Sequence, residues 1–137
     1  MRPAALWLLA AALLAGCGGS GGSEWPGPVQ AAADGSVSVE GFDETAASPE
    51  ALTAGFLRLD EQRAARVSVV TSTPSEGAAR ATVVTTLDGL LDDSVEAVRY
   101  VLAVSATDDG WRIESARRTQ RCRAGRGHRG FSAAPCV

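Results

Sequence analysis

Few side chains in this sequence are of the types that carry out acid–base or nucleophilic chemistry. The chain has one histidine, His128, and two pairs of adjacent aspartates, Asp92-Asp93 and Asp108-Asp109. Adjacent carboxylates point apart in a strand and lie in water in a turn, so we interpret both pairs as turn formers. His128 stands in a Gly/Arg-rich segment where a solvated imidazole is expected. Gly19-Ser20 and Gly35-Ser36 lie in the expected linker, so we interpret neither as a Gly-x-Ser-x-Gly nucleophile elbow, and no phosphate-binding glycine loop precedes an expected helix. The sequence therefore predicts no catalytic residue, no metal and no cofactor.

The N-terminus has the pattern of a secretory signal. The apolar run from Ala4 to Ala15 is shorter than the roughly 20 residues that a bilayer span needs, and it fits the core of a signal peptide. The residues Leu14-Ala15-Gly16-Cys17 resemble the lipobox of bacterial lipoproteins. That resemblance implies cleavage between Gly16 and Cys17, a diacylglyceryl lipid on Cys17, and an exported chain anchored by lipid to the outer face of the cell membrane. The alternative is an ordinary signal peptide in which Cys17 is incidental.

Cys122 and Cys136 are the cysteines that remain once Cys17 is assigned to lipid. In an exported protein two spare cysteines are expected to pair. The loop closed in this way has about 15 residues and contributes about 3 kcal/mol on the chain-entropy view. A metal or redox pair is the rival interpretation, but there is no Cys-x-x-Cys spacing and too few ligands for zinc. The sequence thus predicts a Cys122–Cys136 disulfide.

The formal charge of −3 conceals an uneven distribution. Residues 112–137 contain 7 arginines and one acid, net +6, whereas residues 1–111 contain 6 arginines and 15 acids, net −9. One interpretation is a face for an anionic partner such as phospholipid headgroups, wall polymers or an acidic protein, formed by Arg123, Arg126 and Arg129. The alternative is internal pairing of this tail with the acidic body. Its candidate pairs are Arg117, Arg118 and Arg121 with Asp88, Asp92 and Asp93. Nucleic acid is not an expected partner.

The candidate residues named above must be positioned by secondary structure, and the sequence indicates one helix and several strands. Ser48-Pro49-Glu50 is typical of a helix start, and an apolar stripe of Leu52, Phe56 and Leu59 indicates a helix over 49 to about 63. From residue 66 the apolar period changes to two, which indicates strands. The expected strands cover 66–72, 81–87, 95–107 and 111–122, with turn signals at 88–89 and 108–110.

The connections are short, so the strands are expected to pair antiparallel in sequence order with the helix on one face. We predict an α+β domain with one helix packed on a four-stranded antiparallel sheet and a C-terminal disulfide loop. In element order it resembles the cystatin-like or NTF2-like layout. With 137 residues the chain has room for one domain, which excludes a large enzyme with a deep core. The expected division is a lipoprotein signal peptide over 1–16, the lipidated cysteine and a flexible Gly/Ser/Pro tether over 17–36, and the domain over 37–137.

Several segments resemble a group of small exported proteins from high-GC Gram-positive bacteria. These segments are Phe56-Leu57-Arg58-Leu59-Asp60, residues 87–95, residues 111–122, Gly125-Arg126-Gly127-His128, Phe131 and Cys136. The resemblance covers roughly residues 45–137. It implies a shared domain and a C-terminal disulfide, and it carries over no activity and no catalytic residue.

Two functions from different classes remain. The first is a membrane-anchored envelope lipoprotein that acts as a non-enzymatic binding or accessory module, with the membrane and an anionic or protein envelope component as partners. The second is a small NTF2-like ligand-binding domain or enzyme. It would have a pocket between helix and sheet, with His128 or Tyr100 turned inward.

Overall fold

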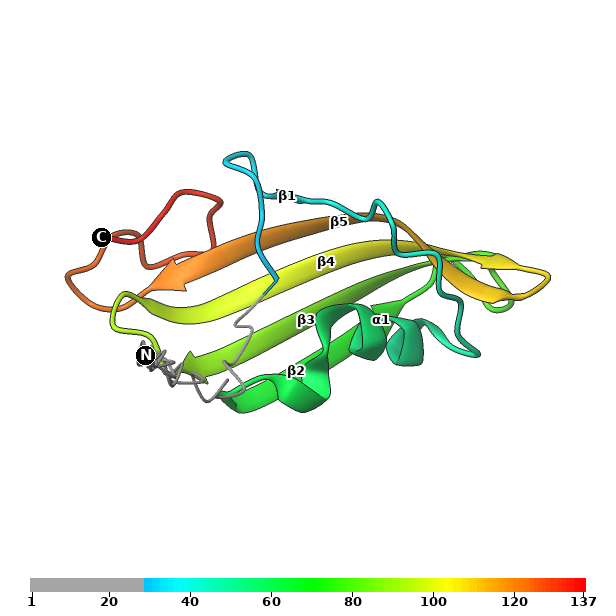
Figure 1. The fold of residues 1–137 in the computed structure, drawn as a ribbon, viewed down its shortest axis with the longest axis horizontal. Helices are drawn as coiled ribbons and strands as arrows, with labels where there is room; N and C mark the ends of the chain where they lie inside the picture. Colours follow the sequence, from blue (N-terminus) through cyan, green and yellow to red (C-terminus); the bar gives the residue numbers. More distant parts are fainter. Residues whose placement is uncertain (1–28) are drawn as a thin grey trace, which may run out of the picture.

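A computed structural model describes residues 29–137, and within this part the chain is an α+β domain with one α-helix and one five-stranded antiparallel sheet. Figure 1 shows the arrangement. The elements along the chain are β1 (Ser36–Val37), α1 (Pro49–Leu57), the 3-10 turn η1 (Leu59–Glu61), β2 (Ala64–Ser72), β3 (Arg80–Leu90), β4 (Val95–Thr107) and β5 (Gly110–Cys122). In space the strands follow the order β1-β5-β4-β3-β2. The four long strands pair in sequence order, as their short connections predict.

The expectation of four strands is corrected by β1, which adds a fifth. Ser36 pairs with Arg117 and Val37 with Ala116, so β1 lies along the free side of β5. A strand of two residues is too short to show an alternating pattern, which explains why the sequence does not reveal it. The segment before it, which we expected to belong to the tether, also contacts the domain: Val29 and Ala31 pack against the core.

The helix starts where the sequence predicts and ends earlier. The Ser48 hydroxyl accepts a hydrogen bond from the Ala51 amide at 3.1 Å, which caps the first turn. The expected end near residue 63 is wrong, because Arg58 takes a left-handed conformation with φ of 51° and ends α1 after Leu57. Leu59 then packs from η1, so the apolar stripe continues beyond the helix.

Strand β3 runs further than expected. Residues Asp88 and Gly89, which the sequence marks as a turn, lie within β3, and the chain reverses after Leu90. Gly89 has φ of 68°, and a Cβ there would lie 2.6 Å from the Cβ of Ala65 on β2. Glycine therefore serves here as a point of close strand contact.

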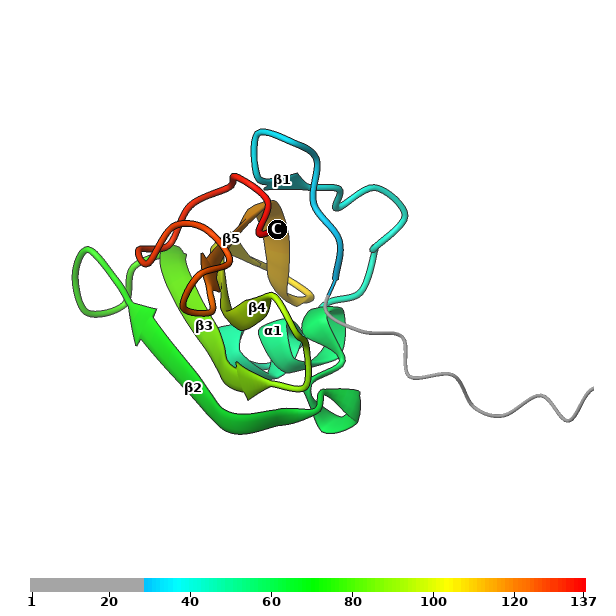
Figure 2. The same cartoon turned by 90° about the vertical axis from the view of Figure 1, so that its left-hand side faces the viewer.

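The core lies between α1 and the inner face of the sheet, which curves around the helix (Figure 2). Four alternate residues of β4 point inward and are at most 1% exposed, as their spacing predicts: Val98, Tyr100, Leu102 and Val104. Leu52 and Leu57 meet them from the helix. No helix of residues 29–137 covers the opposite face of the sheet, where Val101 is exposed. The domain therefore has one buried and one open sheet face.

Tyr100 connects this core to the N-terminal segment. Its side chain is fully buried, and its hydroxyl donates a hydrogen bond of 2.8 Å to the carbonyl oxygen of Val29. Burial raises the pKa of Tyr100 to about 12, and the nearby guanidinium of Arg118 opposes the rise. The neutral phenol thus holds Val29 against the sheet.

We expect the stability of the domain to fall between about pH 10 and pH 12. Over this range the tyrosine ionises in the unfolded chain, near its ordinary pKa of 10.0, before it ionises in the folded one, so unfolding becomes easier as pH rises. The full loss is about 3 kcal/mol, from two pKa units at about 1.4 kcal/mol each. The chain has one tyrosine and no lysine, so few other groups titrate there. Urea unfolding of wild type and Tyr100→Phe from pH 8.5 to 11.5 measures the effect.

At pH 8.5 we expect the free energy of unfolding of Tyr100→Phe to be about 1 kcal/mol lower than that of wild type, since the carbonyl of Val29 loses its donor. Between pH 8.5 and 11.5 the stability of this variant should stay constant. A decline of equal slope in both proteins would contradict the assignment to Tyr100.

Candidate functional site

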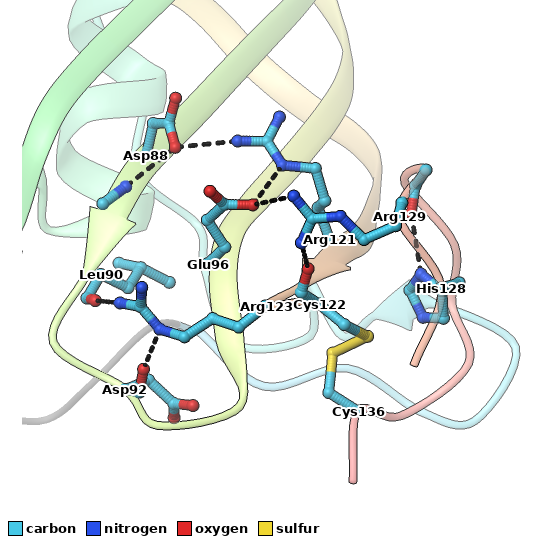
Figure 3. Close-up of polar contacts among 12 residues, drawn as sticks. Asp88, Leu90, Asp92, Glu96, Arg121, Cys122, Arg123, His128, Arg129 and Cys136 are labelled. Atoms are coloured by element: carbon cyan, nitrogen blue, oxygen red, sulfur yellow. Dashed lines mark hydrogen bonds and ion pairs between the residues drawn. A yellow bond between two sulfur atoms is a disulfide. The ribbon is translucent and has the colours of Figure 1, made fainter. Parts of the chain in front are cut away.

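The residues singled out in the C-terminal tail gather at one end of the sheet (Figure 3). Cys122 ends β5 and is fully buried, and Cys136 is bonded to it, with their Cα atoms 5.4 Å apart. The predicted disulfide is confirmed. It closes a loop that returns to β5, because Ser132 pairs with Gln120 through two backbone hydrogen bonds of 2.8 and 3.0 Å.

Gly127 lets this loop pass close to the disulfide. Its φ is 128°, and a Cβ at this position would lie 3.0 Å from the Sγ atom of Cys122. Both the backbone conformation and the space therefore require glycine. Gly125 also has a positive φ, 79°, but no atom lies close to it, and no helix follows this Gly-x-Gly pair that could bind phosphate.

Two of the three arginines predicted to form an anionic-partner face are engaged within the protein. Arg123 donates hydrogen bonds of 2.7 Å to the carbonyl oxygens of Leu90 and Asp92, so it fastens the loop to the β3–β4 turn (Figure 3). Arg129 donates to the carbonyl oxygen of Cys122 and lies 3.2 Å from the carboxylate of Glu96. These guanidinium groups form charge-assisted hydrogen bonds with backbone carbonyls.

Arg126 differs from these two. It is exposed, and within residues 29–137 its side chain forms no hydrogen bond or ion pair. Its backbone carbonyl accepts from the Val137 amide at 2.9 Å, which fixes the position of the residue while the guanidinium stays free. Of the predicted face, Arg126 alone presents its charge to solvent without a partner in the described part of the chain.

The internal pairing that the charge pattern suggests occurs mainly at Arg121. Its guanidinium lies 3.0 Å from carboxylate oxygens of both Asp88 and Glu96, and Glu96 is shared with Arg129. The side chains of Arg121, Asp88 and Glu96 are about 30% exposed, so their ion pairs are partly shielded from water. The cluster links β3, β4 and β5 to the loop.

The other candidate pairs are arranged differently. Arg117 donates to the backbone carbonyl of Asp34 at 2.9 Å, and Arg118 lies on the inner face beside Tyr100. The Ser36 hydroxyl donates a hydrogen bond to the Asp34 carboxyl, and the Ser36 amide donates another with a smaller effect. Together they hold the pKa of Asp34 below its usual value. The Asp92 carboxylate accepts from the amides of Ser94 and Val95 at 2.8 and 2.6 Å and is thus a turn former.

Phe131 fixes the loop to the open face of the sheet. The guanidinium carbon of Arg99 lies 3.9 Å from the ring centroid and that of Arg121 lies 5.3 Å from it. Cation–π contacts of this kind contribute about 0.5–2 kcal/mol depending on their exposure. Arg99 and Arg121 therefore support the loop as well as the sheet.

His128 lies against the disulfide, a proximity that the sequence does not reveal. Its ring and the two sulfur atoms offer ligand atoms within 4.8 Å of one another, the spacing of a three-ligand metal site. The sulfurs are bonded to each other, so neither is a thiolate ligand in this state. The ring nitrogens lie 2.7 and 2.9 Å from the carbonyl oxygens of Gly130 and Ala134, so His128 stabilises the loop to which it belongs.

The surface hollows in the described part of the chain include three of about 300–460 Å³, and α1 lines none of these three. The largest of the three lies beside the β4–β5 hairpin. Its lining includes five acids and one arginine: Glu40, Asp43, Glu44, Asp109, Glu114 and Arg112. The other two lie along β5 and across the open face near Pro74. Between α1 and the sheet, where a ligand pocket was the alternative expectation, Leu52, Leu57 and Leu87 pack together in the core.

The chain matches no protein-family model, no curated protein and no solved structure. No helix within residues 29–137 has the length and apolar character needed to cross a membrane. Gly16 and Cys17, the predicted cleavage and lipidation residues, lie outside the described residues.

We expect Arg123→Ala to destabilise the domain by about 1–3 kcal/mol, because the partly buried carbonyl of Leu90 and the exposed carbonyl of Asp92 lose a charged donor. Arg126→Ala is the matched control, with a change within about 0.5 kcal/mol, since its side chain contacts no partner in the described chain. Urea unfolding of the oxidised proteins measures both values. Equal stability of the two variants would show that the Arg123 contacts contribute nothing.

Proposed function

We propose that this chain is a lipoprotein of the cell envelope, anchored through Cys17 at the outer face of the membrane, with a non-enzymatic binding or accessory domain. One observation carries the anchor. Of three cysteines in the chain, Cys122 and Cys136 are bonded to each other, which leaves Cys17 as the only cysteine for a lipid. It stands in the lipobox-like segment directly after an apolar run of signal-peptide length. A disulfide inside the domain is typical of exported proteins and supports the same location.

We also propose that the domain belongs with the small exported proteins of high-GC Gram-positive bacteria that its segments resemble, and that its layout is cystatin-like or NTF2-like. The curvature of the sheet around one helix supports this layout (Figure 2). So does the element order, in which the helix precedes a meander of four long strands.

The proposed binding surface for an anionic envelope component centres on Arg126. Arg123 and Arg129 hold the loop, so they present Arg126 rather than bind the partner themselves. An arginine near an anionic surface contributes about 1 kcal/mol, which corresponds to roughly a fivefold change in affinity.

The anchor is tested by the intact mass of the protein extracted from membranes of a bacterial host. We expect a chain that begins at Cys17 and carries two or three acyl chains, and that partitions into the detergent phase. Cys17→Ser is expected to lose the acyl mass, whereas Cys136→Ser keeps it, because only the first removes the acceptor sulfur. An unacylated chain beginning at Cys17 would refute the anchor.

The binding surface is tested with the unlipidated chain 17–137 carrying Cys17→Ser and with vesicles of phosphatidylglycerol or phosphatidylcholine. We expect binding to the anionic vesicles only, and a loss of about fivefold for Arg126→Ala. Arg80→Ala is the matched control, because Arg80 is also exposed and begins β3 at the opposite end of the sheet. Equal losses for both variants would show unspecific attraction, and unchanged binding for Arg126→Ala would remove this surface.

A further inference from the structure

The two edges of the sheet differ in how many other segments of residues 29–137 form backbone hydrogen bonds to them. Along β5, four separate segments bond to the outer edge: Ala46 to Trp111, β1 with Gly35 to residues 116–118, Ser132 to Gln120, and His128 to Cys122. Along β2, the nine residues Ala64–Ser72 pair with β3 on one side, and no other segment of residues 29–137 forms a backbone hydrogen bond to them. In Figure 1 the β2 strand forms the lower margin of the sheet.

The β2 edge also lacks the devices that protect free edges. Proteins block such edges with proline, bulges, short strands or several charges. β2 contains no proline, pairs with β3 without a register shift, and has one charged residue, Arg66. Its valines are exposed on both faces: Val67 is 43% exposed, Val69 37% and Val70 58%. An edge of this length with these side chains is a template for another strand.

We propose that two copies of this chain pair through β2, antiparallel and related by a two-fold axis, to form one continuous ten-stranded sheet. The proposal rests on the structure of residues 29–137 and is independent of the lipid anchor and of the Arg126 surface. It commits to a second copy because β2 complements itself in this arrangement.

In this arrangement the side chains of the two β2 strands match each other, as their backbone groups do. A two-fold axis normal to the sheet places residues of the same face opposite each other, and one such register is centred on Val69. In that register Val67 lies opposite Thr71 and Arg66 opposite Ser72, so apolar and β-branched groups meet and the arginines stay apart.

The ends of the strand carry opposite charges. Arg63 precedes β2 and Glu76 follows it, both are exposed, and neither has a side-chain partner within residues 29–137. An antiparallel copy brings the start of one strand beside the end of the other, so Arg63 of each copy faces the turn after β2 of the other, which carries Glu76. The same charges repel in a parallel arrangement, where Arg63 would meet Arg63.

Sedimentation velocity of chain 17–137 with Cys17→Ser, from 1 to 500 µM, tests the pairing in a protein that has neither a lipid nor a free thiol. A strand-sized interface is small, so we expect a monomer–dimer equilibrium with a Kd on the order of 10–100 µM. Val69→Lys is expected to weaken the dimer at least tenfold, because two ammonium groups would face each other at the axis. The control is Val101→Lys, since Val101 is similarly exposed at 38% but lies on central β4, and it should leave the dimer unchanged.

The charged ends provide a test by rescue. Arg63→Glu alone and Glu76→Arg alone are each expected to weaken the dimer about two- to fivefold, and the two changes together should restore it. A chain that stays monomeric up to 500 µM would overturn the proposal. So would a dimer that resists Val69→Lys or that Val101→Lys disrupts, because the contact would then lie elsewhere.

Discussion

The rest of this structure depends on one mismatch of lengths between a short helix and long strands. The nine residues of α1 extend about 14 Å, whereas thirteen residues of β4 extend about 43 Å. One helix of this length cannot cover the inner face of such a sheet if the sheet is flat. The strands therefore curve around α1, and segments without regular structure complete the cover. Val29 and Ala31 before β1, and Val39 and Phe42 after it, all pack against the core.

The long strands could be predicted because burial imposes a period of two on them. Val98, Tyr100, Leu102 and Val104 show this period in the sequence and are buried in the structure. The features that were missed arise from contacts between distant residues or from rare backbone conformations. The end of α1 depends on Arg58, a non-glycine residue in the left-handed region, for which its sequence neighbours give no signal.

The C-terminal tail shows which contacts the charge composition of a segment can predict and which it cannot. Its excess of arginine did indicate internal pairing, and Arg121 with Asp88 is such a pair. Composition could not indicate that Arg123 would bond to two carbonyl oxygens, since any residue supplies a carbonyl. His128 beside the disulfide was equally hidden, because the loop that brings them together is closed by the disulfide and by the pairing of Ser132 with Gln120. Side-chain identity thus predicted ion pairs better than it predicted contacts with the backbone.

The hydrogen bond between Tyr100 and Val29 has a consequence for the proposed membrane anchor. With Val29 held on the sheet, only eleven residues, 18–28, lie between Val29 and the proposed anchor at Cys17. Even at full extension, the twelve Cα–Cα steps from Cys17 to Val29 reach only about 40 Å. The domain would then be confined to a thin layer above the lipid. Anchored copies would meet within this layer at a higher effective concentration than in free solution, so a larger fraction of them would be paired through a weak contact.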